Sequence, residues 1–135
     1  MTVTGFQREM DVEIRVRYQE TDAMGVLHHA NYVTYFEIGR TELLRSTGIS
    51  YKQLEDEGIL MVIVRINIRY RRPAKYDDVL RLRTRTVRSS GAKIDHTYQL
   101  FRGDELICEG ESTLACVDRN GKVQRVPEWL RLDDE

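Results

Sequence analysis

The sequence lacks a long apolar run, a basic leader segment and a strong excess of charge. No stretch of the 135 residues approaches the roughly 18 apolar residues that a bilayer-spanning helix needs. The N-terminus, MTVTGFQREMDVE, has no basic segment followed by an apolar one, so we expect no secretory signal peptide. The formal net charge of −1 argues against non-specific binding of nucleic acid. We therefore expect a cytoplasmic protein with no transmembrane segment.

Cysteine and proline are also scarce, with two residues of each. Cys108 and Cys116 fall in a segment that alternates like a strand, and eight residues of extended chain span about 27 Å. A disulfide needs Cα atoms within about 7 Å, so we expect two free, buried thiols and no internal bridge. The length and the mixture of 41% hydrophobic and 32% charged residues predict one globular domain over residues 1–135.

The first half of the sequence predicts a strand, a loop and a long helix. Apolar and charged residues alternate over residues 12–18, which is typical of a half-buried strand. After a polar loop at residues 21–30, apolar residues recur at helical spacing. Asn31 is a suitable N-cap for this helix and Gly48 a suitable stop. A second, short helix is predicted over residues 50–57.

The second half predicts strands only. These cover residues 62–71, 79–88, 93–102 and 106–118, and the short turns between the last three indicate an antiparallel meander. In the first of them, positions 62, 64, 66, 68 and 70 are apolar and are expected to share one face. Trp129 and Leu130 are expected to dock a C-terminal turn. The element order predicts an α+β fold in which one helix covers a curved five-stranded sheet.

Arginines line one face of the predicted sheet. Such a face could bind nucleic acid, but acidic residues on neighbouring strands can pair with the arginines across the sheet. The aromatic residues that single-stranded nucleic acid stacks on are absent from this set. We predict a solvated, charge-paired face or an oligomer contact, and no nucleic-acid partner. The arginines are Arg65, Arg69, Arg71, Arg81, Arg83 and Arg85, and the acidic residues are Asp95, Glu109 and Glu111.

The loop before the long helix concentrates residue types that can carry chemistry. Asp22 precedes Gly25, and His28, His29 and Asn31 lie where the helix begins. A helix N-terminus offers free backbone N–H groups to an anion or an oxyanion, and a nearby carboxylate can attack a carbonyl or activate water. The same residue types also form ordinary turns and caps, so the loop alone leaves both interpretations open. No third ligand follows the two histidines at a suitable spacing, so we expect no metal site.

The segment YQETDAMGVLHHANYVTYFEIGR resembles the signature of the 4-hydroxybenzoyl-CoA thioesterase family, and in particular its YbgC-like branch. The segment RYRRPAKYDDVL is similar to a strand end and turn of the same family. The resemblance covers roughly residues 12 to 125. The positions that match the family pattern are Tyr18, Asp22, Gly25, His29, Asn31 and Tyr32.

The resemblance implies a hotdog fold, in which the sheet wraps around the long helix, and a homodimer, often a dimer of dimers, with active sites between subunits. It implies an acyl-CoA thioesterase with Asp22 as nucleophile or general base and the backbone N–H of His29 as oxyanion donor. The side chains of His29 and Tyr18 would orient or polarise the site, or serve as loop packing and strand core. Asn31 is a site residue or an N-cap, and Gly25 would let a substrate approach the backbone. No cofactor or metal is required.

The resemblance also implies contacts to the nucleotide phosphates from the turn between the third and fourth strands. In this chain that turn supplies Arg88, Ser89, Ser90 and Lys93, although Ser-Ser-Gly is equally an ordinary hairpin turn. The presence of His29 where the 4-hydroxybenzoyl enzyme has a tyrosine argues against an aromatic substrate. The expected substrate is an acyl-CoA or an acyl carrier protein thioester. A non-catalytic module that binds acyl-CoA or a partner protein is the alternative.

Overall fold

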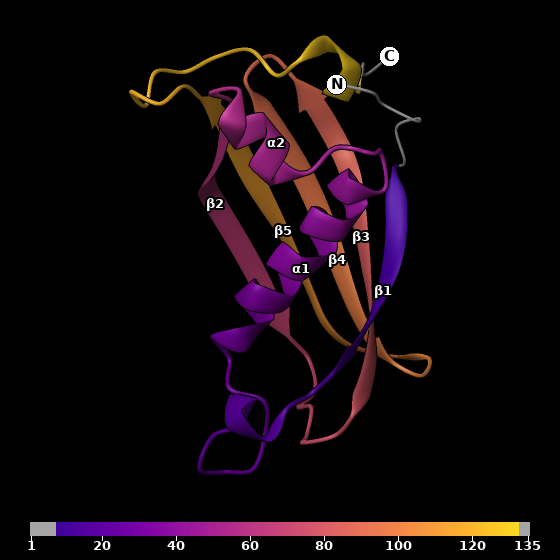
Figure 1. Ribbon diagram of the computed structural model, residues 1–135. Coiled ribbons are helices and arrows are strands. Elements are labelled where there is room, and N and C mark those ends of the chain that lie inside the picture. The colour runs from indigo at the N-terminus through magenta and orange to yellow at the C-terminus, as the bar shows by residue number, and fades with distance from the viewer. Residues whose placement is uncertain (1–7, 133–135) are drawn as a thin grey trace.

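A curved, five-stranded antiparallel sheet holds one long helix against its inner face in the computed structural model (Figure 1), which describes residues 8–132. The segment 1–7, where we expect no signal peptide, and residues 133–135 lie outside this range. The strand order is β1-β3-β4-β5-β2, and every neighbouring pair is antiparallel. The strands are β1 (Glu9–Arg15), β2 (Leu60–Tyr70), β3 (Val79–Ser90), β4 (Lys93–Arg102) and β5 (Glu105–Val117). The predicted α+β hotdog arrangement is confirmed, with β3, β4 and β5 as the meander.

Both predicted helices are present. The long helix α1 (Asn31–Arg45) ends shortly before Gly48, whose φ of +92° lies in the left-handed region that favours glycine. The short helix α2 (Tyr51–Asp56) begins after Ser50, whose hydroxyl accepts a hydrogen bond from the Gln53 backbone. No helix in the described part of the chain is long and apolar enough to cross a bilayer.

Two glycines allow α1 to lie close against the sheet. A Cβ atom on Gly39 would overlap the Thr84 hydroxyl and lie 2.7 Å from Leu82 Cδ2. On β5, a Cβ atom on Gly110 would lie 2.6 Å from the ring of Phe36, which stacks on another core aromatic ring. The helix and the sheet therefore approach more closely here than side chains at these two positions would permit.

The sequence predicted one apolar face along the whole of β2, and this prediction is wrong over the first half of the strand. A β-bulge between Ile63 and Arg65 shifts the pairing with β5 by one residue. Ile66 and Ile68 pack against the core as predicted, but Val62 and Val64 are 41% and 53% exposed. An extra residue in one strand disrupts the alternation of side chains beside it, and Ile63, between the two valines, is also 41% exposed.

The predicted first strand is also too long. β1 ends at Arg15, and Tyr18 begins a single 3₁₀ turn, η1 (Tyr18–Glu20). Val16 is buried as expected, but Tyr18 is 77% exposed and is therefore not part of a strand core.

Two further predictions are confirmed. Cys108 and Cys116 are both buried and free in β5, and burial raises the pKa of the Cys108 thiol to about 12. At the C-terminus, Trp129 and Leu130 dock in the 3₁₀ turn η2 (Glu128–Leu130) against a second apolar cluster, which also includes Leu54 of α2.

The outer face of the sheet carries the arginines, and several of them form ion pairs. Arg65 pairs with Glu111 at 3.0 Å, and Arg71 pairs with Glu109. These are the cross-sheet pairs that the sequence predicted. Asp11 on β1 was not predicted as a partner, but it accepts hydrogen bonds from both Arg81 and Arg83, and these bonds lower the pKa of its carboxyl.

Candidate active site

A buried carboxylate that sequence reasoning missed organises the loop before α1. Glu20 is only 7% exposed, and its side chain accepts hydrogen bonds from the Arg17 backbone at 2.8 Å and the Tyr35 hydroxyl at 2.7 Å. The Arg17 guanidinium donates a further hydrogen bond to the same carboxylate at 3.0 Å. Burial raises the pKa of Glu20, but these hydrogen bonds outweigh burial and hold the pKa below its usual value. Glu20 is therefore ionised, and hydrogen bonds to both of its carboxylate oxygens anchor the loop.

The backbone of Glu20 also fixes the start of α1. Its carbonyl oxygen accepts hydrogen bonds from the His28 N–H at 2.9 Å and from the Asn31 side-chain amide at 2.8 Å. Asn31 is therefore not the N-cap that the sequence suggested, because it is the first helical residue and Ala30 precedes it as N-cap. The Asn31 side chain instead ties the helix to the loop, which is a positioning contact.

Asp22 lies in a tight turn of this loop and is half-buried. Its Oδ1 atom accepts hydrogen bonds from the backbone of Met24 at 2.9 Å and of Val26 at 3.4 Å. Within residues 8–132 no donor reaches Oδ2. One carboxylate oxygen therefore holds the turn, while the other has no partner in the described structure.

Gly25 closes the Asp22 turn. Its φ is +81°, and its N–H donates to the Asp22 carbonyl oxygen at 2.9 Å. A Cβ atom here would have no neighbour within 4 Å, so the glycine is required by backbone conformation and not by crowding.

The backbone at His29 presents a free N–H group. The preceding carbonyl, that of His28, accepts from the Asn31 N–H at 3.0 Å. Because a trans peptide points its C=O and N–H in opposite directions, the His29 N–H points away from this contact. It has no acceptor in the part of the chain that the structure describes. The next carbonyl, that of His29, accepts a 3.0 Å hydrogen bond from the Tyr70 hydroxyl on β2.

The two histidine side chains stack on each other, with ring centroids 4.2 Å apart. The Nδ1 atom of His28 accepts a hydrogen bond from the Ala30 N–H at 3.1 Å, so His28 belongs to the loop structure and is half-buried. The His29 side chain is exposed. Of the two histidine side chains, that of His29 is therefore the one that a substrate could contact.

Tyr18 lies at the outer end of the same loop. Its ring contacts Tyr76 edge-on, with centroids 5.6 Å apart, and Met24 at the loop tip is 84% exposed. Exposed apolar side chains thus gather on and beside the loop that carries Asp22. The loop that leads into α1 lies at the bottom of Figure 1.

The predicted phosphate contacts lie at the opposite end of the sheet. β3 runs from beside β1 at the Asp22 end to its turn at the far end (Figure 1), about 36 Å for twelve extended residues. Ser89 is fully buried there and donates a 2.7 Å hydrogen bond to the Leu130 carbonyl. Ser90 accepts from Arg88 at 3.3 Å, and Lys93 is exposed. A single chain therefore does not bring this turn and Asp22 together.

Comparison with known proteins decides the family. A family model described as the thioesterase-like superfamily matches residues 16–132, which include the whole loop and both helices. The chain belongs to the thioesterase-like superfamily. This confirms the family resemblance of the Tyr18–Tyr32 segment and makes the protein a thioester hydrolase by class.

Similar members of this superfamily come from several bacteria. The chain is 36% identical over 114 residues to the Haemophilus influenzae acyl-CoA thioesterase YbgC, covering 84% of this chain and 83% of the relative. It is 35% identical over 106 residues to the acyl-CoA thioester hydrolase YbgC of Escherichia coli O6:H1, covering 78% and 79%. A DHNA-CoA thioesterase structure from Staphylococcus aureus superposes with a TM-score of 0.84 at 31% identity, covering 87% and 80%. The hotdog fold of the superfamily is thus shared over nearly the whole chain.

Among residues 8–132, no three His, Cys, Asp or Glu side chains gather closely enough to hold a metal ion. The groups available for chemistry in the loop are therefore the free carboxylate oxygen of Asp22, the free N–H of His29 and the exposed side chains around them.

Proposed function

We propose that the protein hydrolyses an acyl-CoA, or the matching acyl carrier protein thioester, to the free acid and a thiol, with Asp22 as the catalytic carboxylate. One observation carries this proposal. A single short loop presents a carboxylate oxygen and a backbone N–H that both lack a hydrogen-bond partner among residues 8–132. Thioester hydrolysis needs these two groups, one to deliver the nucleophile and one to stabilise the oxyanion.

Two routes use the same groups. In the first, Asp22 attacks the thioester carbonyl, the C–S bond breaks to release the thiolate, and water then hydrolyses the mixed anhydride. In the second, Asp22 takes a proton from water as the water attacks the carbonyl, the C–S bond then breaks, and the leaving sulfur takes the proton from Asp22 to give the thiol. In both, the His29 N–H stabilises the oxyanion, while Tyr18 and the His29 side chain orient the thioester. Neither route consumes a cofactor or a metal.

The relatives support the substrate class. The similar YbgC proteins are named as an acyl-CoA thioesterase and an acyl-CoA thioester hydrolase. We extend this substrate class to the chain described here, together with a cytoplasmic location. The length of the acyl group is left open.

We further propose that the active unit is a homodimer paired through β2, and that two dimers associate. β2 is an eleven-residue edge strand that exposes Val62, Ile63 and Val64, whereas the other edge, β1, is shorter and carries acidic residues that discourage pairing. Antiparallel pairing of two β2 strands would set the Tyr70 end of one subunit against the Leu60 end of the other. The phosphate contacts at Arg88, Ser90 and Lys93 would then come from the partner, with Ser89 holding the turn.

The test is a thiol-release assay against a panel of acyl-CoA and acyl carrier protein thioesters. The wild type is compared with Asp22→Asn, whose amide oxygen can still accept the Met24 hydrogen bond, and with Asp104→Asn in the exposed β4–β5 turn as control. We expect hydrolysis by the wild type and the control. Tight binding of acyl-CoA without hydrolysis of any thioester would favour the alternative, a non-catalytic binding module.

A further inference from the structure

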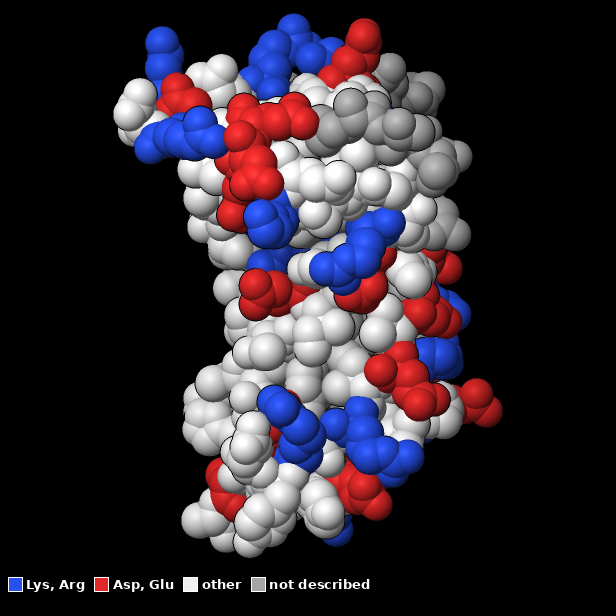
Figure 2. Space-filling view, viewed as in Figure 1, with Lys and Arg blue, Asp and Glu red and all other residues white. Residues whose placement is uncertain are grey.

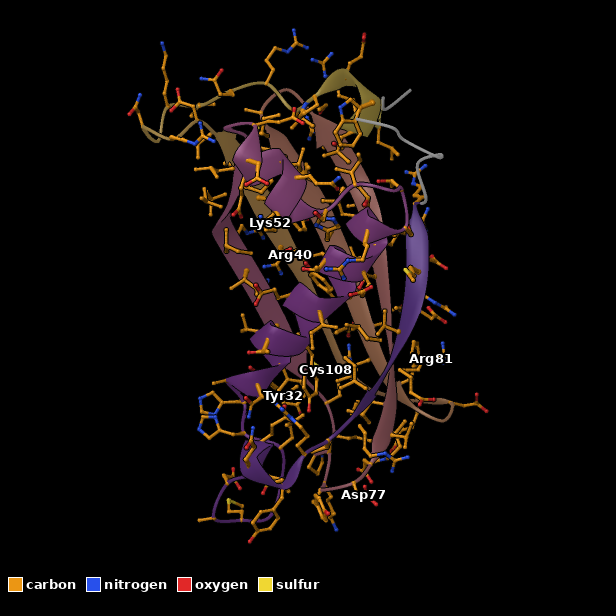
Figure 3. The ribbon with its side chains drawn as sticks, viewed as in Figure 1. Tyr32, Arg40, Lys52, Asp77, Arg81 and Cys108 are labelled. Atoms are coloured by element: carbon orange, nitrogen blue, oxygen red, sulfur yellow. The ribbon has the colours of Figure 1, made fainter. Side chains whose placement is uncertain are left out.

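A surface cavity of about 490 Å³ opens between α1, α2 and the beginning of β2. Figure 2 shows acidic side chains over most of α2 and basic ones next to them, at the beginning of α2 and over the C-terminal half of α1, and Figure 3 shows Arg40 on α1 close below Lys52 on α2. We call this space the Arg40 cavity. Its charged and aromatic lining consists of Glu37, Arg40, Arg45, Tyr51, Lys52 and Glu55.

Arg40 forms no ion pair with any described residue that lines this cavity. The Nη1 atom of Arg40 is buried and meets no hydrogen-bond acceptor within the described residues. The two other basic residues of the lining each form an ion pair, Arg45 with Glu42 and Lys52 with Asp56 at 3.4 Å. Almost every buried polar group in a folded protein has a partner, because a buried donor without an acceptor destabilises the fold. The Nη1 group of Arg40 is therefore available to an acceptor that comes from outside the chain.

The inner wall of the cavity offers no compensating charge. A smaller space of about 20 Å³, the size of one water molecule, is lined by Arg40, Tyr51 and His96. His96 is 4% exposed and its Nδ1 atom has no partner among residues 8–132. Burial, together with the charge of Arg40, lowers the pKa of His96 to about 3, and burial raises the pKa of Tyr51. Both side chains are neutral at physiological pH, so neither balances the guanidinium.

The acidic residues of the lining do not neutralise the charge of Arg40 either. Glu37 and Glu55 are exposed, and neither forms an ion pair in the described structure. Solvent screens charges at the rim of a cavity far more than it screens a buried guanidinium. The field at the bottom of the cavity is therefore set by Arg40.

We propose that the Arg40 cavity is an anion-binding site that receives a carboxylate or phosphate group of the thioester substrate. The guanidinium of Arg40 suits both groups because its planar donors match two oxygens at once, and Tyr51, which lines the same cavity, carries a hydroxyl that can also donate. This inference rests on the proposed function for the identity of the ligand, whereas the anion site itself rests on Arg40, Tyr51 and His96.

The dimer proposed above connects this cavity to the reaction. Met61, at the beginning of β2, lines the Arg40 cavity. Antiparallel pairing of β2 would bring this end of one subunit next to the Tyr70 end of the other, where Tyr70 binds the backbone of His29. A substrate held at Asp22 of one subunit would then reach the Arg40 cavity of its partner. Either the phosphates of CoA or a carboxylate at the far end of the acyl group would supply the anion.

The first test measures binding without chemistry. Inorganic phosphate, glutarate and CoA are titrated calorimetrically into the full chain carrying Asp22→Asn, alone and combined with Arg40→Met, which keeps the aliphatic stem, Arg40→Lys or Arg69→Gln. Arg69 is the matched control, since it is exposed on the outer face of the sheet. We expect Arg40→Met to weaken anion binding at least about tenfold, Arg40→Lys to weaken it less and Arg69→Gln to leave it unchanged.

Two outcomes would overturn the proposal. One is the absence of binding of all three probes at millimolar concentration, and the other is equal affinity in a folded Arg40→Met protein. If Arg40→Met does not fold, Lys52→Gln at the exposed rim replaces it, with an expected severalfold loss of affinity; unchanged affinity there would count equally against the site.

The second test distinguishes the two sources of the anion. We compare kcat/KM for glutaryl-CoA and pentanoyl-CoA, which have the same chain length, in the wild type and in Arg40→Met. An acyl carboxylate in the cavity predicts that the wild type prefers glutaryl-CoA and that the variant loses this preference. A CoA phosphate predicts an equal rise in KM for both substrates. Failure to hydrolyse either thioester would contradict the proposed function but leave the binding result intact, and unchanged kinetics in the variant would contradict the assignment of the cavity to substrate.

Discussion

The Tyr70 hydroxyl on β2 donates a 3.0 Å hydrogen bond to the carbonyl oxygen of His29, two positions before the first residue of α1. This bond joins the edge strand to the peptide that follows the proposed oxyanion donor. The Tyr70 ring also packs edge-on against Tyr32, with centroids 4.9 Å apart. The orientation of the His29 backbone therefore depends on a residue 41 positions away.

Replacement of Tyr70 by phenylalanine tests this dependence. Tyr70→Phe keeps the ring contact and removes the hydrogen bond, so we expect kcat to fall by roughly tenfold while KM stays close to the wild-type value. Steady-state kinetics measure both parameters. Tyr76→Phe is the control, because that ring is exposed and its hydroxyl bonds to nothing in the described structure. A kcat within twofold of wild type in Tyr70→Phe would remove the positioning role.

Glu20→Gln tests the buried anchor of the loop. The substitution removes the negative charge that Arg17 and Tyr35 bind, and a buried hydrogen bond to a charged group contributes about 1.5–3 kcal/mol. We expect a loss of unfolding free energy of that size in urea denaturation, together with reduced kcat/KM. Glu13→Gln, on an exposed position of β1, should change neither quantity. Equal stability of the two variants would show that Glu20 is not an anchor.

The neutral His96 predicts how stability depends on pH. The pKa of His96 falls from its ordinary 6.5 to about 3 in the folded chain, so the unfolded chain binds more protons between these values. Stability from this group is complete above pH 6.5 and is lost as the pH falls toward 3. The slope is at most about 1.4 kcal/mol per pH unit.

Urea denaturation between pH 7 and about 4.5 measures this slope, because the carboxyl groups with lowered pKa, such as Glu20, titrate below that range. His96→Gln should flatten the curve in this window. The same slope in the variant and the wild type would show that His96 is protonated in the folded protein.

Gly39→Ala tests the close approach of helix and sheet. The added methyl group would overlap the Thr84 hydroxyl and crowd Leu82, and overpacking of this kind costs about 1–3 kcal/mol. Thermal unfolding should therefore show a lower midpoint, although alanine favours a helix more than glycine does. Thr34→Ala, on the exposed face of the same helix, should show no such loss. A higher midpoint for Gly39→Ala would mean that the helix can move away from the sheet without cost.

The sequence predicted the features that local signals encode. The turns at Gly91 and Gly103 fixed the β3–β4–β5 meander, and Ser50 and Gly48 marked helix ends through their own capping and backbone preferences. The Tyr18–Tyr32 segment led to the family because its spacing is specific.

Features that depend on distant partners were missed. The bulge at Val64 arises from pairing with β5, about fifty positions later, and the burial of Glu20 depends on Tyr35, fifteen positions later. A glutamate in a polar loop carries no local sign that it is buried. Asn31 looked like an N-cap by type, but the carbonyl of Glu20 lies within its reach and determines its role.

The most direct test of the central claim is kcat/KM of Asp22→Asn relative to the wild type, with one acyl-CoA that the wild type hydrolyses. The substitution keeps the size of the side chain and its hydrogen bond from Met24, so the loop should stay folded. A loss of at least about 10²-fold in a folded variant is the result predicted for the catalytic carboxylate. A value equal to that of the wild type and of Asp104→Asn would contradict the assignment of Asp22.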